Sequence, residues 1–239
     1  MSLSLAKKKF LRSLKQRKYR YNEQCFLAEG NTLVADLLRL GMQPVDIFIL
    51  DDKDAALFPG STTIGLNDRK AFSNFDNPAG AAAVFRMPQW GTLEGLQHLS
   101  FVPALYAVQD PGNLGTILRT ACWFGFQHIL LLDGCADPYN SKAIQAGMGA
   151  VAQVSLVQAK LNDLQGLPHQ ILGAHMQGES LYSLEMPKQS ILIFGNEGSG
   201  LPENLAYHPV SIPKAPHSQM ESLNVAMAAG IAFSIVANS

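Results

Sequence analysis

The chain has 239 residues, of which 47% are hydrophobic and 15% are charged. This composition allows a sizeable buried core and excludes a largely disordered protein, and the length fits a small domain joined to a medium-sized one. The net charge of −1 identifies no partner, but the charge is unevenly distributed. Residues 1–20 hold eight of the 18 basic side chains and no acidic one, so the remaining chain has 10 basic and 19 acidic residues, a net charge of −9.

The amino-terminal basic segment is expected to form one helix over residues 4–20, since its apolar residues Leu5, Phe10, Leu11 and Leu14 recur on one side. A basic segment on an acidic body favours a phosphate-bearing partner. The alternative is a solubilising amphipathic helix without a ligand. Tyr19 and Tyr21 can stack on bases or form the edge of a core.

Cysteine usage and hydropathy indicate a cytoplasmic protein without a metal site. Cys25, Cys122 and Cys135 are widely spaced and include no Cys-x-x-Cys pair, so neither a zinc site nor a disulfide framework is expected. The basic residues from Lys7 onward interrupt any signal peptide. The uncharged residues 222–239 contain Ser, Asn and Gly, which indicates a buried helix and no membrane span.

The pattern of apolar runs divides the chain near residue 90. Residues 1–90 are expected to form a small α/β domain that ends at a linker over 87–91. In residues 91–239, short buried runs alternate with helical patterns, which predicts a mostly parallel sheet covered by helices. The expected strands there are 105–108, 129–132, 154–157, 171–174, 191–194 and 210–212, and the expected helices are 113–124, 141–149, 161–167 and 222–236.

A glycine-rich loop, Gly195-Asn196-Glu197-Gly198-Ser199-Gly200, follows the buried run 191–194. Its glycines permit positive φ and close approach to a ligand, and open α/β sheets bind ligands at the carboxyl ends of their strands. The order Gly-x-x-Gly-x-Gly differs from the dinucleotide fingerprint, and no Gly-Lys-Ser/Thr is present, which disfavours NAD and ATP. The alternative is a tight turn with a solvated Asn and Glu.

A second motif covers residues 110–120. A Pro-Gly turn ends the preceding strand, and Asn113 is expected to cap the following helix. Arg119 lies one turn after Gly115, on the same helix face, so its side chain can reach toward a ligand. The alternative for Arg119 is a surface ion pair with a neighbouring acid.

A third motif runs from Ile212-Pro213 to the last helix. Ser222 is expected to cap that helix, which is apolar on nearly all sides. Asn224 in its first turn needs a partner, because an unpaired buried amide costs ~1–3 kcal/mol.

The three motifs, NxGxxxR at 113–119, GNEGxGL at 195–201 and IP…ESLNVA at 212–226, follow one another in an order shared by one family. Over about residues 103–236, the chain resembles the SpoU (TrmH) family of RNA 2′-O-ribose methyltransferases, in the SPOUT superfamily. Residues 17–38 resemble the amino-terminal substrate-binding domain of that family, which is similar to ribosomal proteins of the kink-turn-binding type. The stretch between Pro213 and Ser222 is longer than the family's usual linker.

The resemblance implies an α/β sheet with a trefoil knot near the carboxyl end, S-adenosylmethionine as cofactor, structured RNA (tRNA or rRNA) as substrate, and a homodimer with the site at the subunit interface. It implies that Arg119 is the catalytic residue, surrounded by Asn113, Glu197, Ser222 and Asn224. The implied cofactor-binding residues are Ala174, Gly195, Asn196, Gly200, Ile212 and Leu223, and the loop 174–178 is expected beside them. The implied RNA contacts are Lys15, Arg17, Lys18, Arg20 and Arg119.

Other functions remain open at this point. An RNA-binding or ribosome-assembly factor of the same fold would need no catalysis, although the motif residues Arg119 and Glu197 speak against it. Methylation of a base in place of a ribose is a further possibility. A dehydrogenase is disfavoured, since no residues suited to reductive chemistry lie near the glycines.

Overall fold

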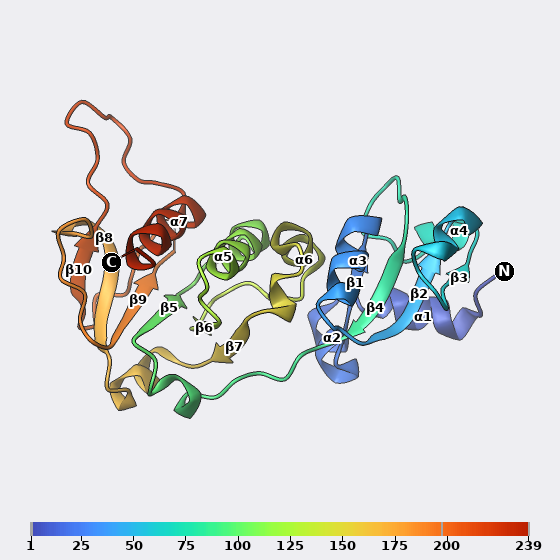
Figure 1. Ribbon diagram of the computed structural model, residues 1–239, viewed down its shortest axis with the longest axis horizontal. Coiled ribbons are helices and arrows are strands. Elements are labelled where there is room, and N and C mark those ends of the chain that lie inside the picture. Colours follow the sequence, from blue (N-terminus) through green and yellow to red (C-terminus); the bar gives the residue numbers. More distant parts are fainter. Residues whose placement is uncertain (1, 197, 239) are drawn as a thin grey trace. The chain divides into compact units, whose positions relative to one another are not determined.

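The computed structural model describes residues 2–196 and 198–238 (Figure 1). The chain divides into two compact units. The first comprises Met1–Pro88 and Asp137–Ala152, and the second comprises Gln89–Ala136 and Gln153–Ser239. Residues 137–152 therefore belong with the first unit, although the sequence predicts them in the second domain.

The first unit contains a four-stranded mixed sheet in the order β1-β4-β2-β3. Its strands are β1 (Cys25–Glu29), β2 (Pro44–Ile49), β3 (Thr62–Thr63) and β4 (Ala82–Arg86). β4 is antiparallel to both β1 and β2, and β3 is parallel to β2. The helices of this unit are α1 (Leu5–Ser13), α2 (Arg17–Glu23), α3 (Asn31–Arg39), α4 (Leu66–Lys70) and α6 (Ser141–Gly147).

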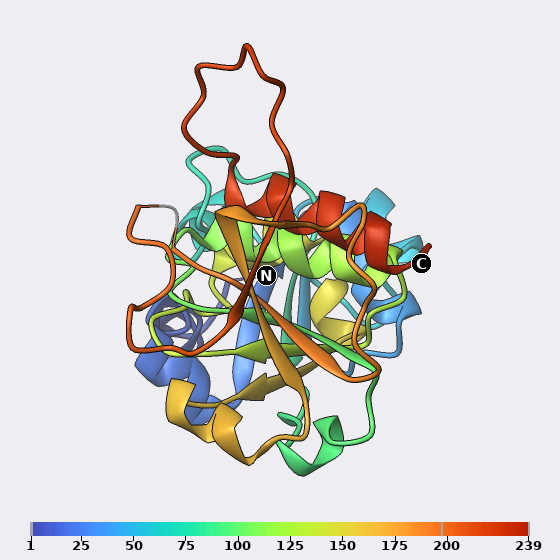
Figure 2. The ribbon, with the colours of Figure 1, turned by 90° about the vertical axis from the view of Figure 1, so that its left-hand side faces the viewer.

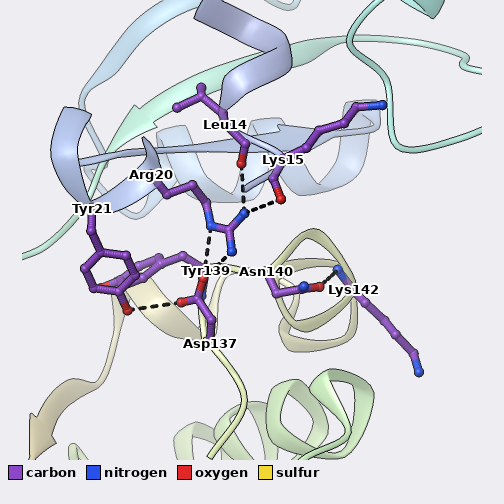
Figure 3. Close-up of polar contacts among 8 residues, drawn as sticks. All are labelled: Leu14, Lys15, Arg20, Tyr21, Asp137, Tyr139, Asn140 and Lys142. Atoms are coloured by element: carbon purple, nitrogen blue, oxygen red, sulfur yellow. Dashed lines mark hydrogen bonds and ion pairs between the residues drawn. The ribbon is translucent and has the colours of Figure 1, made fainter. Parts of the chain in front are cut away.

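The amino-terminal basic segment forms α1 and α2, and the prediction of a single helix over 4–20 is wrong. Leu11 and Leu14 are buried in a core shared with strands β1, β2 and β4, so the segment is an integral part of the first unit. Arg20 Nη1 donates hydrogen bonds to the carbonyls of Leu14 and Lys15, at 2.8 Å each (Figure 3). These bonds satisfy carbonyls at the end of α1 that the helix itself leaves unpaired.

A buried ion pair anchors residues 137–152 in the first unit. Arg20 Nε lies 3.0 Å from Asp137 Oδ2, and Nη2 of Arg20 contacts the same oxygen (Figure 3). Asp137 Oδ1 accepts from the hydroxyl of Tyr21 at 3.1 Å and from the backbone N–H of Tyr139 at 3.0 Å. Every partner that a buried carboxylate requires is therefore present.

The second unit contains a six-stranded sheet in the order β10-β8-β9-β5-β6-β7, and all of its strand pairs are parallel. The strands are β5 (Phe101–Leu105), β6 (His128–Leu131), β7 (Ser155–Gln158), β8 (Gln170–Ser180), β9 (Ser190–Phe194) and β10 (His208–Ser211). Every residue of β9 is buried, as expected for a central strand covered on both faces. The prediction of a mostly parallel α/β sheet is confirmed.

Two helices, α5 (Pro111–Trp123) and α7 (Val225–Val236), lie side by side over one face of this sheet (Figure 1). The ring of Phe233 in α7 packs against Phe194 at the end of β9, with ring centroids 5.7 Å apart, and against Phe126 at 5.2 Å. This packing fixes the last helix against the central strand. No helix within the described part of the chain is long and apolar enough to cross a membrane.

A second buried ion pair lies inside the first unit. Glu29, at the end of β1, is 2.7 Å from Arg69 Nη1 in α4. The same carboxylate accepts hydrogen bonds from Ser73 Oγ at 2.6 Å, Asn74 N at 2.8 Å and Asn74 Nδ2 at 2.9 Å. Burial by itself would raise the pKa of Glu29, but Arg69 and these hydrogen bonds together outweigh burial and lower it.

We expect Glu29→Gln to lower the free energy of unfolding by about 3–5 kcal/mol at neutral pH, because it leaves the buried Arg69 charge without its counter-ion. The lowered pKa means that the Glu29 carboxylate stabilises the fold fully above the unfolded-state pKa of ~4.3 and progressively less as pH falls through the folded-state pKa. Urea unfolding should therefore show a gap between wild type and variant that narrows below about pH 4.

The matched control is Asp51→Asn, which removes an exposed ion pair with Lys53 and keeps a side chain able to cap the following turn. Its stability should equal that of the wild type. A gap for Glu29→Gln that stays constant between neutral and acid pH would contradict the assignment.

Candidate active site

Three loops of the second unit meet at the carboxyl ends of the strands β5, β9 and β10. The end of β5 is joined to its neighbours by backbone hydrogen bonds from Tyr106 N to Phe194 O and from Ala107 N to Asp133 O, both 2.9 Å long. Ala107 has a φ of 51°. A Cβ placed on Gly134 would lie only 3.0 Å from the Cβ of Ala107. This edge of the sheet is therefore tightly constructed around the turn that leads into α5.

The glycine-rich loop after β9 is organised by the side chain of Asn196. Its Nδ2 donates to the carbonyl of Ala107 at 2.9 Å, and its Oδ1 accepts from the N–H groups of Gly198 and Ser199 at 2.9 and 3.0 Å. Two backbone bonds between Asn196 and Gly200, 3.2 and 2.9 Å long, close the loop. Among the described residues, Asn196 Nδ2 uses one of its two N–H groups for the bond to Ala107, so the second remains for a cofactor contact.

The glycines of this loop have a clear steric reason. A Cβ on Gly195 would lie 2.6 Å from the backbone of Gly200, and Gly200 itself has a φ of +66°. A side chain at Gly195 would collide with the backbone of Gly200, and a side chain at Gly200 would be strained by the left-handed backbone. Glu197, predicted to be near the catalytic residue, lies outside the described residues.

The side chains of Asn113 and Asn224 meet at the start of the two helices. Asn224 Nδ2 donates to Asn113 Oδ1 at 3.1 Å, although the two residues are 111 positions apart. Asn224 is also the N-cap of α7, since its Oδ1 accepts from Ala226 N at 2.9 Å and from Met227 N at 3.3 Å. The contact brings the amino-terminal ends of α5 and α7, with their partial positive charges, to one place.

Two capping predictions are corrected by this arrangement. Asp110, not Asn113, caps α5, by accepting from the N–H of Asn113 at 2.8 Å. Pro111 at the first helical position is the sequence signal that would have identified Asp110. Asn224, not Ser222, caps α7, because the helix begins at Val225 and Ser222 is exposed before it. Asn224 is exposed, which differs from the buried position expected for it, and its side-chain partner is Asn113.

Arg119 is exposed on α5. Its side chain forms no hydrogen bond or ion pair with another described residue. The surface ion pair considered as an alternative is therefore not seen within the described residues. Leu223 is 51% exposed next to the Asn224 cap, and Ile212 is partly exposed directly after β10. Between them, the chain forms a long loop that extends away from the sheet of this unit (Figure 2).

The expected loop at 174–178 falls within the bounds of β8 and forms an irregular excursion there, since Gly173 pairs with Pro209 and Glu179 with the next residue, Val210. β8 continues from Gln170 to Ser180, and Glu179 and Ser180 pair with Val210 and Ser211 of β10. A Cβ on Gly178 would lie 2.6 Å from the backbone of Pro209, so this glycine permits the close approach of the two strands. Ala174 is the first residue of this excursion and is partly exposed.

The predicted RNA contacts on the basic segment have different environments in the first unit. Arg20 is only 4% exposed and bound to Asp137, so its assignment as an RNA contact is corrected to an internal structural role. Arg17 and Lys18 are exposed on α2, with the Arg17 guanidinium 5.3 Å from the centre of the Tyr21 ring. Lys15 is exposed and donates from Nζ to the carbonyl of Ser73 at 2.5 Å.

Two family models match the chain. The SpoU rRNA Methylase family model matches residues 100–234, and the MRM3-like substrate binding domain model matches residues 6–81. The first match covers more than half of the chain and includes all three motifs.

Relatives and solved structures agree with this match. The 23S rRNA (guanosine(2553)-2′-O)-methyltransferase RlmP of Bacillus subtilis is 32% identical in an alignment 234 residues long that covers 92% of this chain and 91% of RlmP. The structure of a putative RNA methyltransferase of the TrmH family from Porphyromonas gingivalis is 35% identical, with a TM-score of 0.83 and 98% of each chain covered. An AdoMet-bound rRNA methyltransferase from Sinorhizobium meliloti is 29% identical, with a TM-score of 0.84, and the alignment covers 100% of this chain and 96% of that one. The chain belongs to the SpoU rRNA methylase family.

Proposed function

We propose that this protein transfers a methyl group from S-adenosylmethionine to a ribose 2′-hydroxyl of ribosomal RNA. The observation that carries the proposal is the contact of Asn113 with Asn224, which joins the first and the third sequence motif. The second motif, the glycine-rich loop, is bonded through Asn196 to the turn before Asn113. The similarity to RlmP over nearly the whole of both chains supports the substrate class.

The residues at this edge of the sheet fit S-adenosylmethionine. The loop after β9 has small, exposed residues at 198–200, which leave room for a ligand held through backbone groups. Leu223 and Ile212 provide apolar surface suited to the adenine ring. The backbones of Gly195, Asn196 and Gly200 would complete the binding site. When bound, the cofactor supplies an electrophilic methyl group on a positively charged sulfur.

The protein's own contribution is positioning and charge stabilisation. Holding the 2′-hydroxyl in line for attack can lower the barrier by ~7–11 kcal/mol. Arg119 stays protonated in a protein, so we assign it to binding a nucleotide phosphate and stabilising the developing alkoxide. In this scheme, the hydroxyl proton leaves to an RNA phosphate or to Glu197.

The family resemblance extends the proposal to a trefoil knot in the second unit and to a homodimer. Two large exposed apolar side chains support a dimer in which a second subunit buries them. Trp123 at the end of α5 is 83% exposed, and Met227 in the first turn of α7 is 60% exposed. Burial of such side chains in a subunit interface is favourable in proportion to the apolar area removed from water.

The proposed activity is tested with labelled S-adenosylmethionine and total RNA from cells that lack this protein. We expect label in ribosomal RNA, recovered after nuclease digestion as a 2′-O-methyl nucleoside. Arg119→Ala should lower the rate about 100-fold or more, as the loss of one donor to a developing oxyanion typically does, while cofactor binding measured by calorimetry is retained.

Arg119→Lys serves as the conservative control, because it keeps the charge and loses the forked geometry. A near-wild-type rate for this variant would contradict bidentate binding by Arg119. Label recovered on a base would contradict ribose methylation. Cofactor binding without methylation of any RNA would favour a catalytically silent RNA-binding factor.

The Asn113–Asn224 contact gives a separate prediction. Asn224→Ser keeps a good helix cap but is too short to reach Asn113, so thermal unfolding should be close to that of the wild type. The methylation rate should fall about tenfold, in line with the loss of one hydrogen bond that positions the site. Asn224→Ala is the comparison, since it loses the cap as well and should also be less stable, by ~1 kcal/mol. An unchanged rate for Asn224→Ser would reduce the contact to a structural role.

A further inference from the structure

The basic segment of the first unit is only partly neutralised by internal contacts. Three of its eight cations form ion pairs with carboxylates of the same unit: Lys7 with Asp46, Lys8 with Asp68, and Arg20 with Asp137. No ion pair with a carboxylate is found for the other five among the residues that the structure describes. These five are Lys9, Arg12, Lys15, Arg17 and Lys18.

Two of these cations are fixed on one turn of the chain, at residues 71–75. Arg12 Nε donates to the carbonyl of Ala71 at 2.8 Å, and Lys15 Nζ donates to the carbonyl of Ser73 at 2.5 Å. A carbonyl does not neutralise a positive charge, and both side chains have further N–H donors for another acceptor. Arg12 and Lys15 are both exposed, so their charges are available to an anion.

The same turn is held rigidly from the core side. The buried carboxylate of Glu29 binds the side chain of Ser73 and both the backbone and side chain of Asn74. The backbone N–H of Phe75 donates to Ser73 Oγ at 3.0 Å. This network positions Phe75 before any ligand arrives, and a preordered contact residue loses less entropy on binding.

The side chain of Phe75 is 46% exposed, although its backbone N–H is bonded to Ser73 Oγ. A single exposed phenylalanine has no functional meaning by itself. Here the residue follows Ser73 by two positions, and Lys15 is bound to Ser73. An exposed aromatic ring two residues along the chain from a carbonyl that anchors a cation supplies the combination of ring and charge on which proteins bind single-stranded nucleic acid.

We propose that Phe75, Arg12 and Lys15 form a platform for an unpaired nucleotide of the RNA substrate. The base would stack on the Phe75 ring, and the phosphates on either side of it would bind Arg12 and Lys15. This inference rests on the proposed function, and it adds that the first unit selects RNA segments with unpaired bases. A recognition surface for regular duplex RNA would not require an exposed aromatic ring.

The test uses the full chain and two RNA probes with the same number of phosphates: a hairpin with an unpaired loop, and a blunt duplex. We expect the wild type to bind the hairpin more tightly. Phe75→Ala should weaken hairpin binding about tenfold or more, as expected for one lost stacking contact, and leave duplex binding unchanged. Phe75→Tyr keeps an aromatic ring and should behave as the wild type.

Two further variants separate stacking from charge and from surface hydrophobicity. Arg12→Gln with Lys15→Gln should weaken binding of both probes and reduce the slope of log K against log salt by about 0.7 per lost contact on a single strand. Leu57→Ala removes another exposed apolar side chain of the first unit, one that is 64% exposed, and should change neither affinity.

Equal hairpin affinities for wild type and Phe75→Ala would overturn the platform, and methylation of total RNA by the wild type would then leave the proposed function intact. If the wild type neither bound the hairpin nor methylated total RNA, the proposed function would fail together with the platform. A hairpin affinity that fell equally in Phe75→Ala and Phe75→Tyr would also contradict stacking.

Discussion

The candidate site depends on a constraint of the sheet, the strand order β10-β8-β9-β5. Because β9 pairs with β5, and β8 lies between β9 and β10, segments that are far apart in the sequence end at the same edge of one parallel sheet. The amide contact between Asn113 and Asn224 then joins the two helices that follow β5 and β10. A change that disturbed the packing of Phe233 on Phe194 would displace α7 and remove this contact.

The first unit places its charges differently. The buried pairs Arg20–Asp137 and Glu29–Arg69 are taken out of water, where an unpaired ion costs several kcal/mol. Each of the two carboxylates also accepts hydrogen bonds from other groups. Asp137 makes a later segment of the chain part of this unit, and Glu29 fixes the turn that precedes Phe75. A count of basic residues therefore overstates the charge available to RNA, since part of it stabilises the fold.

In the second unit, β9 was predictable from the sequence because it is a short, continuous apolar run that is buried in the structure. The strand predicted at 105–108 is wrong, because β5 spans Phe101–Leu105 and the chain then turns at Ala107, which has a φ of 51°. The cap of α7 was not predictable, since Ser222 and Asn224 are equally good capping residues and only the backbone geometry selects between them. The cap of α5 could have been identified, since Pro111 marks Asp110 as the residue before the helix. The length of β8 depends on pairing with β10, and the position of residues 137–152 depends on an ion pair with Arg20. Such long-range pairings leave no local pattern in a single sequence.

The chemical character of the site follows from what surrounds it. The described groups are helix amino-terminal ends, backbone amides and the amides of Asn113 and Asn224, and in our proposal the guanidinium of Arg119 joins them. None of these accepts a proton near neutral pH, and arginine in particular remains charged in proteins. A reaction that starts from a neutral hydroxyl and a cationic sulfur builds negative charge on the attacking oxygen, and fixed donors and dipoles stabilise that charge without reorganising. The site is therefore suited to holding reactants in line and stabilising an alkoxide, and the acceptor of the proton must be the RNA, solvent or a residue beyond these groups.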